Sequence, residues 1–116
     1  MTMSMSQIFN KVSRHLIKQN ERSVDTRYKC VYRSNGGLSC AVGCLMTDDI
    51  YDSSFEGDSV RDSSIMEALT PILGVNEDKR VLKLYLLREL QLVHDDSHPT
   101  DWANDLAKIK HDFDIS

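Results

Sequence analysis

The chain has 116 residues, of which 41% are hydrophobic and 28% charged, and 18 acidic against 14 basic residues give it a formal net charge of −4. This composition is typical of one soluble globular domain, and the length allows one modest core. No apolar run approaches the roughly 20 residues of a membrane-spanning helix, and residues 1–7 lack the regions of a secretory signal. Membrane proteins, disulfide-rich miniproteins, repeat arrays and disordered tails are therefore excluded, and we expect one domain over residues 1–116 in the cytoplasm, with reduced thiols.

The first expected element is a helix over about residues 5–19. Ser4 and Gln7 have the spacing of a capping box at its start. Apolar residues then recur every fourth position, which is typical of the buried stripe of an amphipathic helix. The stripe consists of Ile8, Val12 and Leu16, with Phe9 beside it.

Residues 28–43 predict a small antiparallel β-hairpin. Tyr28, Cys30 and Tyr32 alternate with more polar residues, and the sequence Ser-Asn-Gly-Gly at residues 34–37 favours a turn. A three-residue loop over residues 35–37 would pair Tyr32 with Cys40, which places the apolar side chains of both arms on one face.

The rest of the chain predicts an acidic loop followed by three helices. Residues 47–62 are rich in Asp and Ser and indicate an ordered loop with one helical turn, anchored by aromatic side chains. The next helix is expected to be capped by Ser63 or Ser64, to be kinked or ended by Pro71 and to stop at Gly74. The last two helices have the caps Asn76 and Thr100 and the stripes Leu82, Leu86, Leu90 and Val93, then Trp102, Leu106, Ile109 and Phe113. The expected fold class is α+β, mostly helical, with about four helices and one small hairpin.

Charge is distributed unevenly along the chain. Residues 10–33 contain seven bases and two acids, a net charge of +5, whereas residues 46–78 contain nine acids and one base, a net charge of −8. We interpret the two segments as facing each other in the fold or across a homodimer. The alternative is a basic nucleic-acid-binding surface, against which the acidic total argues. That surface would use Arg14, Lys18, Arg22, Arg27 and Arg33.

The cysteines are the first candidates for site chemistry. Cys30, Cys40 and Cys44 with His94 or His98 could supply four zinc ligands, since thiolates and imidazoles suit zinc. Their spacing contains no C-x₂-C pair, and Cys30 and Cys40 occupy alternating positions where small apolar side chains are expected. We therefore favour core packing and expect neither a metal nor another cofactor.

Two further patterns could support catalysis. Cys40 stands among small residues near a predicted turn, where it could act as a nucleophile with His94 as its base and Asp95 beside it. The segment 94–98 (His-Asp-Asp-Ser-His) could also bind a divalent metal or transfer protons. Because this segment lies between two predicted helices, an ordinary helix linker is the favoured interpretation. Phosphate-binding glycine motifs do not occur.

Two stretches carry a resemblance to a known family. Cys30-Val-Tyr-Arg, followed by residues 37–46 (GLSCAVGCLM), by Asp48-Asp-Ile-Tyr and by Glu56-Gly, resembles a group of small phage and prophage proteins. The later Leu90-Gln-Leu-Val-His-Asp matches the same pattern, which covers most of the chain from about residue 6. The resemblance implies the cytoplasm of a host cell as the setting, and it implies no particular chemistry.

From these observations we expect a non-enzymatic accessory protein that binds a host or phage protein, as an inhibitor of a host process such as defence. The alternatives are a small metal- or thiol-dependent enzyme that uses Cys40 and His94, and a nucleic-acid-binding protein. The expected partner surface is the acidic loop, with its charged side chains and aromatic anchors. Its candidate residues are Asp48, Asp49, Tyr51, Asp52, Phe55 and Glu56.

Overall fold

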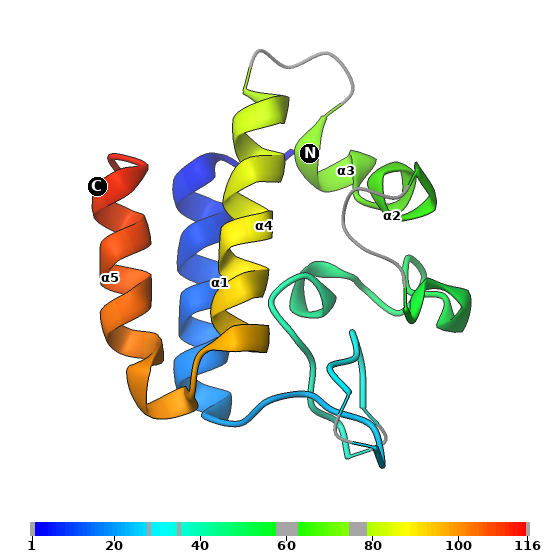
Figure 1. The fold of residues 1–116 in the computed structure, drawn as a ribbon. Coiled ribbons are helices and arrows are strands. Elements are labelled where there is room, and N and C mark those ends of the chain that lie inside the picture. Colours follow the sequence, from blue (N-terminus) through cyan, green and yellow to red (C-terminus); the bar gives the residue numbers. More distant parts are fainter. Residues whose placement is uncertain (1, 28, 35, 58–62, 75–78, 116) are drawn as a thin grey trace.

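Three long helices form one half of the molecule, and turns with short helices form the other (Figure 1). The computed structural model describes residues 2–27, 29–34, 36–57, 63–74 and 79–115. The long helices are α1 (Met5–Gln19), α4 (Arg80–Asp96) and α5 (Trp102–Asp112). The shorter elements are α2 (Ser63–Ala68), α3 (Thr70–Leu73) and the 3₁₀ turns η1 (Gly43–Leu45), η2 (Ser53–Phe55) and η3 (Pro99–Asp101).

Helix α1 confirms the first prediction from residue to residue. Ser4 caps it reciprocally with Gln7, whose backbone N–H donates to Ser4 Oγ at 3.1 Å while Ser4 N–H donates to Gln7 Oε1 at 2.8 Å. Asn20 ends the helix in the left-handed conformation, with its N–H bonded to the Leu16 carbonyl. The predicted stripe is buried, so α1 contributes one complete face to the core.

The predicted hairpin over residues 28–43 is wrong. The described part of this segment contains no strand; it forms one isolated antiparallel bridge within itself, Arg33–Ser39, and one to a preceding residue, Val24–Cys30. Tyr28 and Asn35 lie outside the described residues. The bridge Arg33–Ser39 lies in the predicted register but does not extend, because the Tyr32 N–H, which would bond to the opposite arm in the next pair, donates to the Glu56 carboxylate instead. The fold is therefore mostly helical and does not belong to the α+β class.

The second arm of the expected hairpin ends in η1, where Gly43 lies very close to the backbone of Tyr32. A Cβ atom placed on Gly43 would lie 2.9 Å from the carbonyl carbon of Tyr32 and closer still to its oxygen. Only glycine permits this approach, because every other side chain would collide with the Tyr32 backbone. Cys40 is buried, but Cys30, expected on the same face, is exposed.

The acidic loop and the helix after it follow the predictions where the structure describes them. Residues 47–57 form turns around η2, while residues 58–62 lie outside the described part. The expected helix up to Gly74 is divided at Leu69 into α2 and α3, and Pro71 occupies the first turn of α3. Gly74 ends α3 with a φ of 84°, a conformation that favours glycine.

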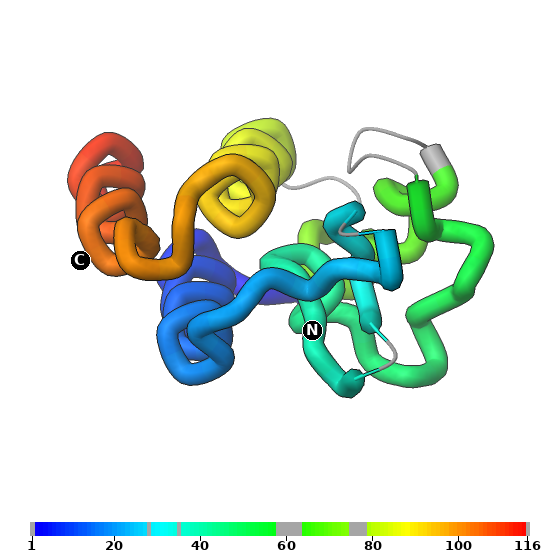
Figure 2. The backbone as a smooth tube through the Cα atoms, turned by 60° about the horizontal axis from the view of Figure 1, so that its bottom comes forward, coloured from blue at the N-terminus to red at the C-terminus, as the bar shows by residue number. Residues whose placement is uncertain are grey.

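Helix α4 is the central helix and contacts α1, α3 and α5 (Figure 2). Its buried side chains include Leu86, Leu90 and Val93, as predicted, but Leu82 is 52% exposed and Lys83 is buried in its place. The predicted cap Asn76 lies outside the described residues. Thr100 is not a cap but part of η3, and its backbone N–H donates to the side chain of His98, the N-cap residue.

The core joins the two halves of the molecule. Trp102, Leu106 and Ile109 of α5 are buried against α1 and α4, and α1 also contacts η1. Phe55, from the acidic loop, and Ile65 and Leu73, from the short helices, belong to the same cluster. None of the helices in the described residues combines the length and the hydropathy needed to cross a bilayer.

Candidate functional site

The residues considered as zinc ligands, and not favoured as such, do not all come together. Cys40 is buried, Cys44 is half-buried and Cys30 is exposed. Among the described residues, the ligand atoms that lie within 4.8 Å of one another belong to Cys30, His94 and Asp95. Cys30 and His94, two of the zinc candidates, therefore lie next to each other, whereas Cys40 and Cys44 do not belong to the group.

His94 is completely buried, and both of its ring nitrogens are hydrogen bonded. The backbone N–H of Ser23 donates to Nε2 at 2.9 Å, so Nε2 presents its lone pair and the ring proton resides on Nδ1. Nδ1 donates to the Asp95 carboxylate at 2.7 Å. A metal ion or a catalytic proton transfer needs a free nitrogen lone pair, and Ser23 already occupies the lone pair of neutral His94. The geometry therefore supports a structural role for this histidine.

His94 is the centre of a junction that fastens the segment after α1 to the end of α4. Arg22 donates to the carbonyl of His94 through Nε at 3.2 Å and to that of Ser97 through its terminal nitrogen at 2.6 Å. The Trp102 indole N–H also donates to the Ser97 carbonyl, at 3.1 Å, and its rings stack on His94 with centroids 5.7 Å apart. We call Arg22, Ser23, His94, Ser97 and Trp102 the His94 junction.

Gln91, on α4, connects Asp95, which contacts His94, to Val42, which lies between Cys40 and Cys44. Its side-chain N–H donates to Asp95 Oδ1 at 2.9 Å, and its carbonyl oxygen accepts the backbone N–H of Val42 at 3.0 Å. Asp95 Oδ1 thus accepts hydrogen bonds from both Gln91 and His94. Gln91 and Asp95 therefore help to hold α4 to the segment around Val42.

The environments of the thiols disfavour the reactive thiolate. Burial raises the pKa of Cys40 to about 12, and the nearby Asp95 charge adds to the effect. Burial likewise raises the pKa of Cys44 to about 12, and burial with the Asp95 charge raises that of Cys30 to about 11. A nucleophilic cysteine needs its pKa lowered by a cation or a helix N-terminus. At neutral pH all three groups are thiols, and Cys40 with His94 is not an activated pair.

The raised thiol pKa values predict a loss of stability in alkali. In the unfolded chain the thiols ionise around the ordinary pKa of 9.0, whereas folded Cys40 and Cys44 keep their protons to about 12. Stability is therefore unaffected below pH 9 and falls as the pH rises from 9 to 12. We expect urea unfolding to show a loss of about 3 kcal/mol between pH 7 and pH 10 from the two thiols together. Cys44→Ala should remove about half of this loss, and an unchanged pH dependence in that variant would contradict the assignment.

Three of the six residues expected to bind a partner point inward. Phe55 belongs to the core, and Tyr51 packs edge-on against it with ring centroids 6.4 Å apart. The Glu56 carboxylate accepts the N–H groups of Tyr32 and Arg33, at 2.8 and 3.2 Å, and the Tyr51 hydroxyl at 2.6 Å. These three side chains attach the acidic loop to the core and to the backbone of residues 32 and 33.

The three aspartates of the loop point outward. Asp48, Asp49 and Asp52 are exposed, and the Asp48 side chain is 99% accessible. Hydrogen bonds to the loop itself lower the pKa of Asp49, whose carboxylate accepts the Thr47 hydroxyl, and that of Asp52, which accepts the Ser54 N–H. The loop therefore presents three exposed carboxylates, and the lowered pKa values favour the charged forms of Asp49 and Asp52.

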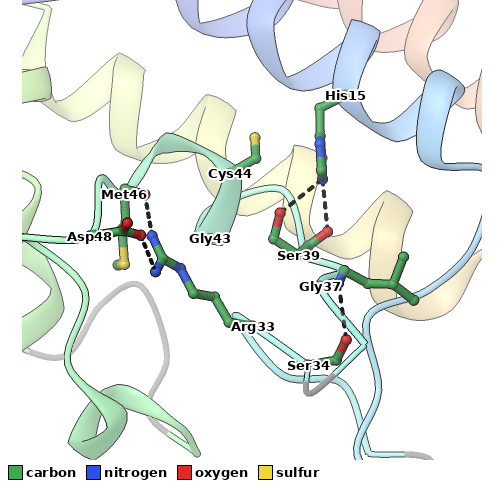
Figure 3. A pocket seen from close by; sticks show the side chains of 10 residues that line it. His15, Arg33, Ser34, Gly37, Ser39, Gly43, Cys44, Met46 and Asp48 are labelled. Atoms are coloured by element: carbon green, nitrogen blue, oxygen red, sulfur yellow. Dashed lines mark hydrogen bonds and ion pairs between the residues drawn. The ribbon is translucent and has the colours of Figure 1, made fainter.

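A depression of about 390 Å³ lies between α1 and the acidic loop (Figure 3). His15 of α1 forms one side, and its Nε2 lies 2.8 Å from the Ser39 carbonyl oxygen. Arg33 forms the opposite side and donates to Asp48 Oδ1 at 2.8 Å and to the Met46 carbonyl at 2.7 Å. Its guanidinium also lies 4.5 Å from the centre of the Tyr51 ring. Further lining residues are Ser34, Gly37, Leu38, Gly43 and Cys44.

The predicted basic surface is only partly available. Arg22 is used in the His94 junction and Arg33 in the depression, so two of the five proposed cations make internal contacts. Arg14, Lys18 and Arg27 are exposed. Within the described part of the chain, the ion pair between Arg33 and Asp48 joins the basic segment to the acidic one.

The sequence did not indicate the contacts that Ser23, Arg22 and Gln91 make around His94 and Asp95, and Arg22 was considered only for the basic surface. Ser23 acts through its backbone N–H and Arg22 through bonds to carbonyl oxygens, and neither leaves a side-chain pattern in the sequence. Gln91 stands four residues before Asp95, the spacing at which helical side chains meet, and this signal could have identified the pair.

Comparisons of this chain with protein-family models, with curated proteins and with solved structures find no significant match.

Proposed function

We propose that this protein is a phage or prophage accessory protein that acts in the host cytoplasm by binding a basic surface of a host or phage protein. The resemblance to small phage proteins supplies the setting, and the acidic loop supplies the binding surface. Carboxylates compete with phosphates for Lys and Arg, so such binding would cover a nucleic-acid-binding surface and inhibit the target in a process such as defence.

The observation that carries this proposal is the support of the loop by Glu56. One carboxylate fixes two backbone N–H groups and the Tyr51 hydroxyl, while Phe55 is anchored in the core. Asp48, Asp49 and Asp52 therefore project from a loop that is already ordered. A surface ordered before binding loses little conformational entropy when a partner docks, and this favours its use as a recognition element.

The internal use of the other polar residues also supports an external binding role. His94 makes two hydrogen bonds inside the protein, and the thiols have raised pKa values. Asp48 is the one aspartate of the three with an ion-pair partner in the described residues, Arg33, and a pair this exposed contributes little energy. The carboxylates can thus exchange their present surroundings for Lys or Arg of a partner at small cost.

Capture from host lysate with a Asp48→Asn/Asp49→Asn/Asp52→Asn variant tests the proposal. Asn keeps the cap at Asp52 and the acceptor for Thr47 at Asp49, so the variant removes charge and retains the loop. Three lost charge contacts predict a decrease in affinity of at least about tenfold for the captured protein, and the wild-type affinity should fall as salt rises. Quantitative mass spectrometry of the captured proteins, then calorimetry with the purified one, measures both effects.

A matched control removes three exposed acids elsewhere, with Glu21→Gln, Glu67→Gln and Asp112→Asn. This control has the same net charge as the loop variant and should retain wild-type binding. Equal capture by the wild type and both variants would remove the acidic loop from the mechanism.

A further inference from the structure

Hydrogen-bond donors converge on the depression between α1 and the acidic loop. Arg33 uses two of the five N–H groups of its guanidinium for Asp48 and the Met46 carbonyl. The Arg33 side chain is 29% accessible, and contacts on two sides and the Tyr51 ring hold it in place. Arginine held in this way is suited to bind an oxyanion with little further ordering.

The hydroxyl groups of Ser34 and Ser39 lie in the same depression. Each hydroxyl oxygen accepts a hydrogen bond within the protein, so each O–H can still donate one. Ser34 Oγ accepts the Leu38 N–H at 3.1 Å. His15 Nε2 lies 2.8 Å from the Ser39 carbonyl oxygen. Because a carbonyl oxygen can only accept, Nε2 carries the ring proton. Ser39 Oγ lies 3.1 Å from the same Nε2 and therefore also accepts from this N–H. In each case the serine O–H can donate to a bound group.

A second cation, Lys11, does not line the depression but lies on the same helix as His15. Lys11 stands four residues before His15 on α1, the spacing that places two side chains on one face of a helix. Burial governs the pKa of the Cys44 thiol, and the Lys11 ammonium acts against it, which places this charge near the Cys44 wall. The neighbourhood thus contains two cations, Lys11 and Arg33, and one carboxylate, Asp48.

We propose that this depression binds the oxyanion group, phosphate or carboxylate, of a small molecule, with Arg33 as the main ligand and the Ser34 and Ser39 hydroxyls as additional donors. The volume of about 390 Å³ falls within the range of small-molecule sites and leaves room for more than the oxyanion itself. Asp48 currently occupies one Arg33 N–H and competes with the ligand. Because Asp48 is almost fully accessible, an incoming oxyanion can displace it.

Titration with inorganic phosphate and, separately, with acetate tests the proposal by ¹H–¹⁵N correlation spectra at constant ionic strength. The expected result is saturable shifts at the amides of Leu38, Gly43 and Cys44, and the comparison of the two anions shows which oxyanion the site prefers. Loss of the guanidinium fork in Arg33→Lys should weaken binding at least about fivefold, and loss of one hydroxyl in Ser39→Ala about threefold. Asp48→Asn should tighten binding at least about threefold, because the competitor loses its charge.

Arg27→Gln, which removes an exposed arginine that does not line the depression, serves as the control and should bind as the wild type does. Shifts that fail to saturate, or equal affinities in the wild type, Ser39→Ala and Asp48→Asn, would overturn the proposal. Ser39→Ala keeps the inference testable if Arg33→Lys disturbs the loop. Asp48→Asn has the opposite expected sign for oxyanion binding and for capture of a basic partner, so this variant separates the two proposals.

Discussion

Gly43→Ala is expected to destabilise the protein by about 3 kcal/mol or more, since overpacking against an immobile group costs about this much. The added methyl group would lie 2.9 Å from the Tyr32 carbonyl carbon, and closer to the oxygen, so the backbone of one segment has to move. Tyr32 cannot yield easily, because its side chain is buried and its N–H is bonded to Glu56. Thermal unfolding should show a decrease in Tm of about 10 °C or more.

Gly36→Ala is the matched control for this prediction. Gly36 is exposed, and a Cβ atom there would meet no atom closer than Ser34 Oγ at 3.9 Å. A surface substitution of this kind should change the free energy of unfolding by less than about 0.5 kcal/mol. If Gly43→Ala were as mild as Gly36→Ala, the close contact between η1 and Tyr32 would not exist as described.

His94→Leu is expected to cost about 3 kcal/mol, because it leaves the buried N–H of Ser23 and one Asp95 contact without their partner. His94→Gln places a carbonyl oxygen where Nε2 now accepts the Ser23 N–H, and should cost less, about 1–2 kcal/mol. His111→Ala, at an exposed position of α5, should be nearly neutral.

The order of the two His94 variants distinguishes two explanations of its burial. If His94 only fills space against Trp102, the apolar Leu should be tolerated better than Gln. If His94 holds Ser23, Gln should be tolerated better than Leu. Urea unfolding at pH 7 measures the difference, and a more stable His94→Leu variant would contradict the hydrogen-bonded role of His94.

The helices could be predicted from the sequence because their signals are local. The capping box at Ser4, the stripe of α1 and the end of α3 at Gly74 each depend on residues within a few turns. Leu82 shows the limit of this reasoning. Periodicity alone places it in the stripe of α4, but in the structure the neighbouring Lys83 is buried and Leu82 is exposed.

The hairpin could not be excluded from the sequence because the residue that interrupts it, Glu56, is distant along the chain. Alternation and turn chemistry correctly bring Arg33 opposite Ser39. The N–H groups of Tyr32 and Arg33 are then bonded by Glu56, more than 20 residues away, and Gly43 approaches the Tyr32 backbone too closely for a strand pair to continue. Both interactions are long-range and have no local pattern.

The candidate site was predictable in composition but not in geometry. The sequence identified the polar cluster around His94 and the acidic loop, and it favoured burial of the thiols over a zinc site. It could not show that Asp48 points outward while Glu56 points inward, because both are acids in one loop. Nor could it show that Arg33 faces a depression shared with α1.

The most direct measurement of the central claim, that the polar residues around His94 serve the interior of the protein, is the ring tautomer of His94. Long-range ¹H–¹⁵N correlation spectra, recorded with and without added zinc, distinguish the protonated ring nitrogen from the unprotonated one. The account predicts a proton on Nδ1, a lone pair on Nε2 directed to Ser23, and no change when zinc is added. A proton on Nε2, or ring signals that shift with one equivalent of zinc, would contradict it.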